Sequence, residues 1–202
     1  MTLKRSLFNI LLVVILLFSF AKLSYALEPK DFVQSTIDKA SEILSSESSK
    51  DEKIVQLRDI AKNTVDIRGI GFYSLGSHRK SLDSDQKKEY LKIFEQYFLK
   101  SFSSRLAEYS NPKIRVDSQE KLNEKYTMVS STLLAGEDKP EVKIDWRIVT
   151  KDPNSPLIID VVIEGVSLAK VQKEEFNSII QSNGGDIKVL FNTLQEFITY
   201  HL

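Results

Sequence analysis

The chain has 202 residues, with 28 basic and 28 acidic side chains and no cysteine. A balanced charge argues against a nucleic-acid-binding protein, whose surface is usually strongly basic. The lack of cysteine excludes a disulfide framework, a thiol nucleophile and a thiolate metal site. The two histidines, His78 and His201, lie too far apart in the sequence for a helical metal pair. We therefore expect neither a metal nor another cofactor.

The first 26 residues have the pattern of a signal peptide. Lys4 and Arg5 precede an almost wholly apolar run over residues 7–20, which is shorter than the roughly 20 residues of a membrane-spanning helix. Ser24 and Ala26 place small residues at the −3 and −1 positions of a cleavage site. We expect export and cleavage after Ala26, and a single domain over residues 27–202 with a net charge near −3. An uncleaved membrane anchor is the alternative.

The N-terminal half of the remaining chain predicts helices. Apolar residues recur at helical spacing over residues 27–49, and again from Asp51 to about Ile67. Gly69 and Gly71 then end or bend the second helix. We expect the apolar residues that follow, up to Leu75, to form a turn that caps the core, with a ligand contact as the alternative.

A third, longer helix is predicted from Ser84 to Tyr109. Asp83 with Gln86 three residues later has the pattern of a capping box. The helix carries an apolar stripe rich in aromatic residues, which can be plain core or can line an apolar cavity. Its members are Tyr90, Leu91, Phe94, Tyr97, Phe98, Phe102, Leu106 and Tyr109.

The pattern then changes from helical to alternating. Strands are predicted over residues 113–117, 125–135, 141–151 and 157–166, with short polar turns between them. Two more helices follow, over residues 168–182 and 186–200. The fold class is therefore α+β, with a curved antiparallel sheet of about four strands packed against helices.

Few residues in this chain are arranged as a catalytic site would need them. Asp145, Asp160 and Glu164 fall on predicted strands, and the last two share a face if the strand is regular. They can pair with cations across the sheet, or two of them can serve as an acid and a base. Arg147 similarly predicts either a cross-strand salt bridge or an anion site.

Three stretches of the sequence resemble the MlaC family. The first is D-V-V-I-E-G-V-S-L from Asp160, followed by Phe176 within E-E-F-N-S-I-I-Q and by a glycine pair. The second is Leu75-Gly76 with Lys80-Ser81 and Gln86, and the third is Trp146-Arg147. The resemblance covers roughly residues 30 to 195. Arg79, Leu82 and the turn at residues 153–156 depart from the family pattern.

The resemblance implies the function of that family, which comprises the periplasmic phospholipid-binding proteins of the Mla lipid-transport system, also known as toluene-tolerance auxiliary transport proteins. It implies a monomeric carrier without enzymatic activity that acts in outer-membrane lipid asymmetry. The carrier exchanges phospholipid with an inner-membrane ABC transporter complex and with an outer-membrane complex of lipoprotein and porin. It also implies an architecture resembling the NTF2-like fold, with an apolar cavity for acyl chains between sheet and helices.

Residues on inward-facing registers are the candidates for lining that cavity. We expect the lipid-binding residues to be Phe94, Phe98, Phe102, Ile144, Trp146, Ile148, Ile159, Val161 and Ile163. Arg147 and Lys173 are the candidates near the mouth, where the head group would lie. Two alternatives remain: an enzyme of the isomerase or dehydratase type on an NTF2-like fold, with Asp160 or Asp145 as base, and a protein-binding adaptor with a solid core.

Overall fold

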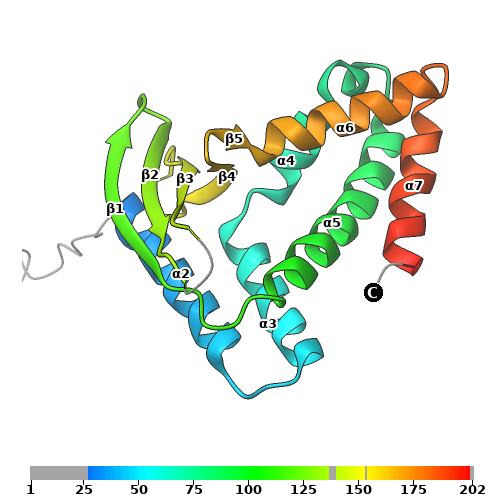
Figure 1. Ribbon diagram of the computed structural model, residues 1–202. Helices are drawn as coiled ribbons and strands as arrows, with labels where there is room; N and C mark the ends of the chain where they lie inside the picture. The colour runs from blue at the N-terminus through cyan, green and yellow to red at the C-terminus, as the bar shows by residue number, and fades with distance from the viewer. Residues whose placement is uncertain (1–26, 137–139, 153, 201–202) are drawn as a thin grey trace, which may run out of the picture.

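The computed structural model describes residues 27–136, 140–152 and 154–200. The predicted signal peptide, its cleavage site and His201 lie outside these residues. The described chain starts with two helices, α2 (Pro29–Ser45) and α3 (Lys50–Thr64), which run antiparallel as a hairpin (Figure 1). A capping box between Ser49 and Glu52 starts α3.

The segment after α3 is helical, and the prediction of a turn there is wrong. Helix α4 (Ile67–Ser74) is followed by a 3₁₀ helix, η1 (Gly76–Lys80). Asp66 caps α4 by accepting a hydrogen bond from the Gly69 backbone N–H at 2.8 Å. A Cβ atom on Gly71 would lie 2.7 Å from the ring of Phe94. Gly71 therefore allows α4 to lie close to Phe94, whereas the low helix propensity of glycine argued against a helix here in the sequence.

The three remaining helices agree closely with the predicted ones. They are α5 (Ser84–Leu106), α6 (Leu168–Ser182) and α7 (Ile187–Tyr200). The predicted capping box of Asp83 and Gln86 is present at the start of α5. The helix ends three residues before Tyr109, so the end of the predicted aromatic stripe lies outside it.

The sheet is an antiparallel meander of five strands in the order β1-β2-β3-β4-β5. Its strands are β1 (Ile114–Lys121), β2 (Tyr126–Leu133), β3 (Val142–Val149), β4 (Leu157–Ile163) and β5 (Val166–Ser167). The expectation of an α+β fold with a curved antiparallel sheet is confirmed, and the additional strand is the two-residue β5. Glu164 and Gly165 join β4 to β5, and both have positive φ angles, 49° and 80°.

The buried apolar residues form two separate clusters. The helical cluster is built from α4, α5, α6 and α7 around Tyr90, Phe94 and Phe176. The sheet cluster joins α2 to one face of the sheet, and its buried members are Phe32, Val33, Ile37, Val129, Ile148 and Ile158. Val65, at the end of α3, packs against both clusters. It also forms an isolated parallel bridge with Ile158, and the Asp66 N–H donates to the Ile158 carbonyl at 2.9 Å.

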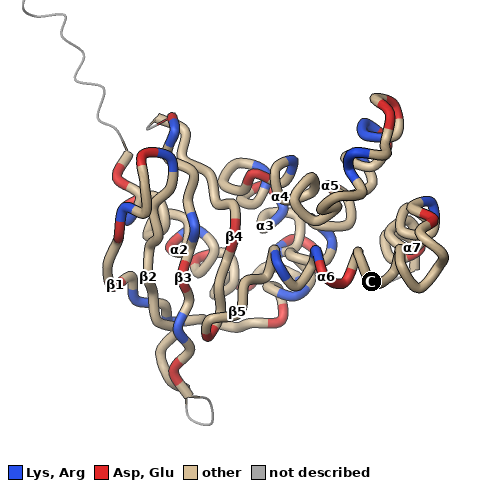
Figure 2. The backbone as a smooth tube through the Cα atoms, turned by 90° about the horizontal axis from the view of Figure 1, so that it is seen from above, with Lys and Arg blue, Asp and Glu red and all other residues tan. Residues whose placement is uncertain are grey.

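The sheet and α5 stand apart in Figure 1, with α6 running from the end of the sheet across to α7. Basic and acidic residues are interspersed along the elements (Figure 2). Among the described residues, no helix has the length and apolar character needed to cross a bilayer.

Candidate functional site

One part of the sheet presents apolar side chains that are only half-buried. The register pairs Val129 with Trp146 and Trp146 with Val161, and in the adjacent row Ile144 pairs with Ile163. Paired residues share a sheet face, so these side chains lie on the same face as the sheet cluster. Ile144, Trp146, Val161 and Ile163 are each partly exposed. We call these four residues the sheet wall.

Trp146 is held in place within this wall by a hydrogen bond. Its indole Nε1–H donates to Ser131 Oγ at 2.8 Å, and the Ser131 hydroxyl lies 3.2 Å from the Ile144 carbonyl oxygen, to which it donates. Ser131 is fully buried and supplies a partner for the polar atom of a ring that is otherwise apolar. The sequence alone gave no reason to single out this serine, because a serine in a strand has no distinctive pattern.

Two other predicted pocket residues on the sheet, Ile148 and Ile159, are not part of the sheet wall. Ile148 is completely buried beneath α2, in the sheet cluster with Val33 and Ile158. The pairing shifts between Arg147 and Ile148, where β4 has one extra residue, Ile159. This bulge brings Ile158 into the core, although regular alternation predicted that it faces the other way, and leaves Ile159 half-buried.

Helix α5 presents a second half-buried apolar surface. Phe98 and Phe102 are stacked with centroids 5.7 Å apart and planes 7° from parallel, and both are partly exposed. We call these two residues the helix wall. Phe94, one turn earlier, is instead buried in the helical cluster against Phe176.

The neighbours of α5 show which way the helix wall faces. Tyr97 contacts Phe197 of α7 with ring centroids 5.1 Å apart, and Ser103 accepts a hydrogen bond from Arg58 of α3. Phe98 and Phe102 lie about 100° and 140° around the helix from Tyr97, on the side away from α7. Figure 1 shows α7 and the sheet on opposite sides of α5, so the helix wall is turned toward the sheet.

The face of the sheet opposite to the sheet wall carries the charged residues. Arg147 pairs with Asp160 across β3 and β4, with Arg147 Nη1 3.2 Å from Asp160 Oδ2. Asp160 is only 4% exposed, and it also accepts hydrogen bonds from Ser167 Oγ at 2.7 Å and from the Ala169 N–H at 3.0 Å. The carboxylate thus fixes the first turn of α6 to β4.

The two other candidate acids are also engaged in structural contacts. Asp145 accepts a hydrogen bond from Ser130 Oγ at 2.6 Å and lies 3.4 Å from Lys143 Nζ. Glu164 is not on the strand, as predicted, but in the turn that follows it, where its carboxylate accepts the Lys143 N–H. Asp160 and Glu164 therefore do not form a pair on one strand face, because β4 ends between them.

Lys173, predicted at the mouth together with Arg147, lies on α6 over the ring of Tyr73, with its Nζ 5.2 Å from the centroid. Arg147 lies on the sheet face opposite to the sheet wall, where it is paired with Asp160. In the described part of the chain, no three acidic or histidine side chains gather in an arrangement that could hold a metal ion. An open surface depression lies on the first turns of α3, lined by Asp51, Glu52, Val55 and Gln56.

Comparisons with known proteins agree with this architecture. The family model described as "MlaC protein" matches residues 34–196. The "Intermembrane phospholipid transport system binding protein MlaC" of Haemophilus influenzae is 24% identical over 166 residues, which cover 78% of this chain and 77% of that protein. The structure of a phospholipid-binding protein from Ralstonia solanacearum, solved in complex with a phospholipid, matches with a TM-score of 0.69 at 18% identity. This match covers 85% of this chain and 97% of that one, and it shows that the fold is shared. Since the family model spans most of the sequence, the chain belongs to the MlaC family.

Proposed function

We propose that this protein binds a phospholipid and transports it through the periplasm, with the acyl chains between the sheet wall and the helix wall. The observation that carries the proposal is that two half-buried apolar surfaces, from separate core clusters, lie on the sheet face that packs against α2 and on the side of α5 away from α7. Burying an acyl chain gains about 0.8 kcal/mol per CH₂ group. Apolar side chains that are left incompletely packed can supply that contact.

The relatives support this proposal. The Haemophilus influenzae protein is named as the binding protein of an intermembrane phospholipid transport system, and the Ralstonia solanacearum protein was solved with a phospholipid bound. We propose further, from the sequence pattern, that residues 1–26 are a signal peptide cleaved after Ala26 and that residues 27–202 form one lipid-binding domain. The mature protein shuttles as a monomer between the inner-membrane ABC transporter complex and the outer-membrane complex.

The geometry does not favour the enzyme alternative. An isomerase or dehydratase on this fold would need Asp145 or Asp160 to face the substrate as a base. Both carboxylates instead lie on the sheet face opposite to Trp146 and accept hydrogen bonds from neighbouring strands or from α6.

The first test is whether the protein carries lipid. The protein is purified without detergent, extracted with organic solvent and analysed by mass spectrometry, and its transfer of labelled phospholipid between liposomes is measured. We expect phospholipid in the extract at a constant molar ratio to protein, and transfer between liposomes. An extract without phospholipid, together with no transfer, would refute the proposal and favour an adaptor with a solid core.

Substitutions in the two walls test where the lipid lies. Ile144→Glu and Phe102→Glu each place a carboxylate in the proposed acyl path, which opposes burial of a hydrocarbon chain. Val55→Glu, at an exposed apolar position on α3, is the matched control. We expect both wall variants to lose most of the bound lipid while the control retains it, with circular dichroism confirming that all three fold. Retention of lipid by folded wall variants would mean that it binds elsewhere.

A further inference from the structure

A phospholipid has a phosphate as well as acyl chains, and most of the cations near the two walls are already engaged. Arg147 is paired with Asp160, and Lys173 lies over the ring of Tyr73. Arg58 donates to Ser103 Oγ at 3.3 Å, and Lys100 donates to the Ile198 carbonyl at the end of α7 at 2.6 Å. None of these four cations shares a helix face or a strand face with the residues of either wall.

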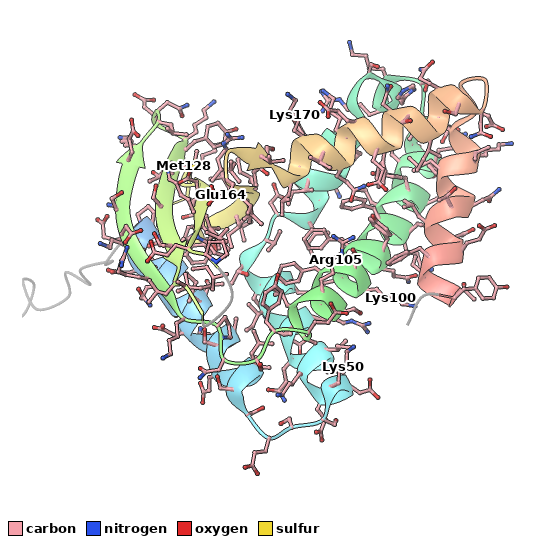
Figure 3. The ribbon with its side chains drawn as sticks, viewed as in Figure 1. Lys50, Lys100, Arg105, Met128, Glu164 and Lys170 are labelled. Atoms are coloured by element: carbon pink, nitrogen blue, oxygen red, sulfur yellow. The ribbon has the colours of Figure 1, made fainter. Side chains whose placement is uncertain are left out.

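Arg105 is different, because the helical repeat places it on the helix wall. It follows Phe98 by seven residues and Phe102 by three, and residues at these spacings share one face of a helix. Its side chain is exposed. Arg105 belongs to the last turn of α5, toward the end of the helix that approaches the sheet (Figure 3). Among the residues that the structure describes, no carboxylate oxygen lies within 4.0 Å of its guanidinium.

The surroundings of Arg105 also fit an exposed cation at the edge of an apolar surface. Burial raises the pKa of the Tyr97 hydroxyl, Glu175 raises it further, and Arg105 acts in the opposite direction, so the guanidinium lies within electrostatic range of that hydroxyl. Tyr97 donates to Gln172 Oε1 at 3.1 Å, and the Gln172 amide donates in turn to Glu175 Oε2 at 2.9 Å. The Glu175 carboxylate thus accepts a hydrogen bond from Gln172.

We propose that Arg105 binds the phosphate group of the phospholipid whose acyl chains lie against Phe98 and Phe102; this inference rests on the proposed function. A guanidinium presents a planar fork of N–H donors that matches two phosphate oxygens. The position is suitable because the arginine stem can lie along the aromatic stack while its charged end stays in water. Since every glycerophospholipid carries this phosphate, Arg105 sets affinity for phospholipids as a class and does not select among head groups.

The test compares two lipids that differ in the phosphate. Short-chain phosphatidylglycerol and short-chain diacylglycerol with the same acyl chains, both soluble without detergent, are titrated into the delipidated protein by calorimetry. The variants are Arg105→Gln, Arg105→Lys and, as a matched control at an exposed arginine of η1, Arg79→Gln. Thermal unfolding of each variant verifies that it is folded.

We expect Arg105→Gln to weaken phosphatidylglycerol binding about tenfold or more, with no change for diacylglycerol. Arg105→Lys should fall in between, because it keeps the charge and loses the fork. The control should bind both lipids as the original chain does. Unchanged phosphatidylglycerol affinity in Arg105→Gln, or an equal loss for both lipids, would overturn the inference and leave the proposed function standing. If the unsubstituted chain binds neither lipid, the proposed function itself fails.

Discussion

Asp160→Asn tests whether the most buried acid of the sheet is a structural group. The carboxylate accepts three hydrogen bonds, from Ser167 Oγ, the Ala169 N–H and Arg147 Nη1. An asparagine keeps only one acceptor oxygen, so its NH₂ group faces either the Ala169 N–H or the donors of Ser167 and Arg147. A hydrogen bond to a buried charged group contributes about 1.5–3 kcal/mol. The bond to Arg147 contributes less because that side chain is 39% exposed to solvent.

We therefore expect Asp160→Asn to lower the free energy of unfolding by about 2–4 kcal/mol. With a urea m-value of about 2 kcal/mol/M, the midpoint should fall by roughly 1–2 M. Trp146 is the only tryptophan of the chain and lies on the neighbouring strand, so its fluorescence follows the transition. Asp145→Asn is the control, with an expected loss of about 1 kcal/mol or less, because its cation partner Lys143 is 64% exposed. Equal midpoints for the two variants would refute this reasoning.

Two further predictions concern the helical cluster. Gly71→Ala should destabilise the protein by about 1–3 kcal/mol, because the new Cβ would meet an aromatic ring at 2.7 Å; Gly136→Ala, where a Cβ meets nothing within 4 Å, is the control in the same urea assay. Burial raises the pKa of Tyr90 and of Tyr97 in the folded state. The stability gained from these neutral hydroxyls is fully present below pH about 10 and is lost as the pH rises above it. Replacing both tyrosines by phenylalanine should therefore flatten the alkaline loss of thermal stability, and an unchanged profile would contradict this assignment.

The sequence predicted the secondary structure best in segments with a single clear apolar periodicity. The long helix with its aromatic stripe, the meander and the last two helices are all present, because the apolar pattern determines which face is buried. The sequence left open whether the aromatic stripe of α5 is core or lines a cavity, and its residues differ in burial along the helix. Phe94 is plain core, whereas Phe98 and Phe102 remain half-exposed.

The errors arose where tertiary contacts override the local pattern. Glycines at 69 and 71 predicted a turn, but a helix forms there. Asp66 caps this helix, and the ring of Phe94 can pack against it because Gly71 has no Cβ atom. The bulge at Ile159 changes the face of β4, and single-sequence alternation cannot reveal an extra residue in one strand. The position of Arg105 beside the helix wall was readable from its spacing, but only the structure shows that this face is turned toward the sheet.

The measurement that tests the central claim most directly is the quenching of Trp146 by phospholipids with bromine atoms on their acyl chains. Trp146 lies in the sheet wall, its indole is fixed by Ser131, and there is no second tryptophan to confuse the signal. If the acyl chains lie between the two walls, brominated lipid should quench this fluorescence strongly, and Phe102→Glu should abolish the effect. Lipid that is bound, as mass spectrometry would verify, but leaves Trp146 unquenched would contradict the account.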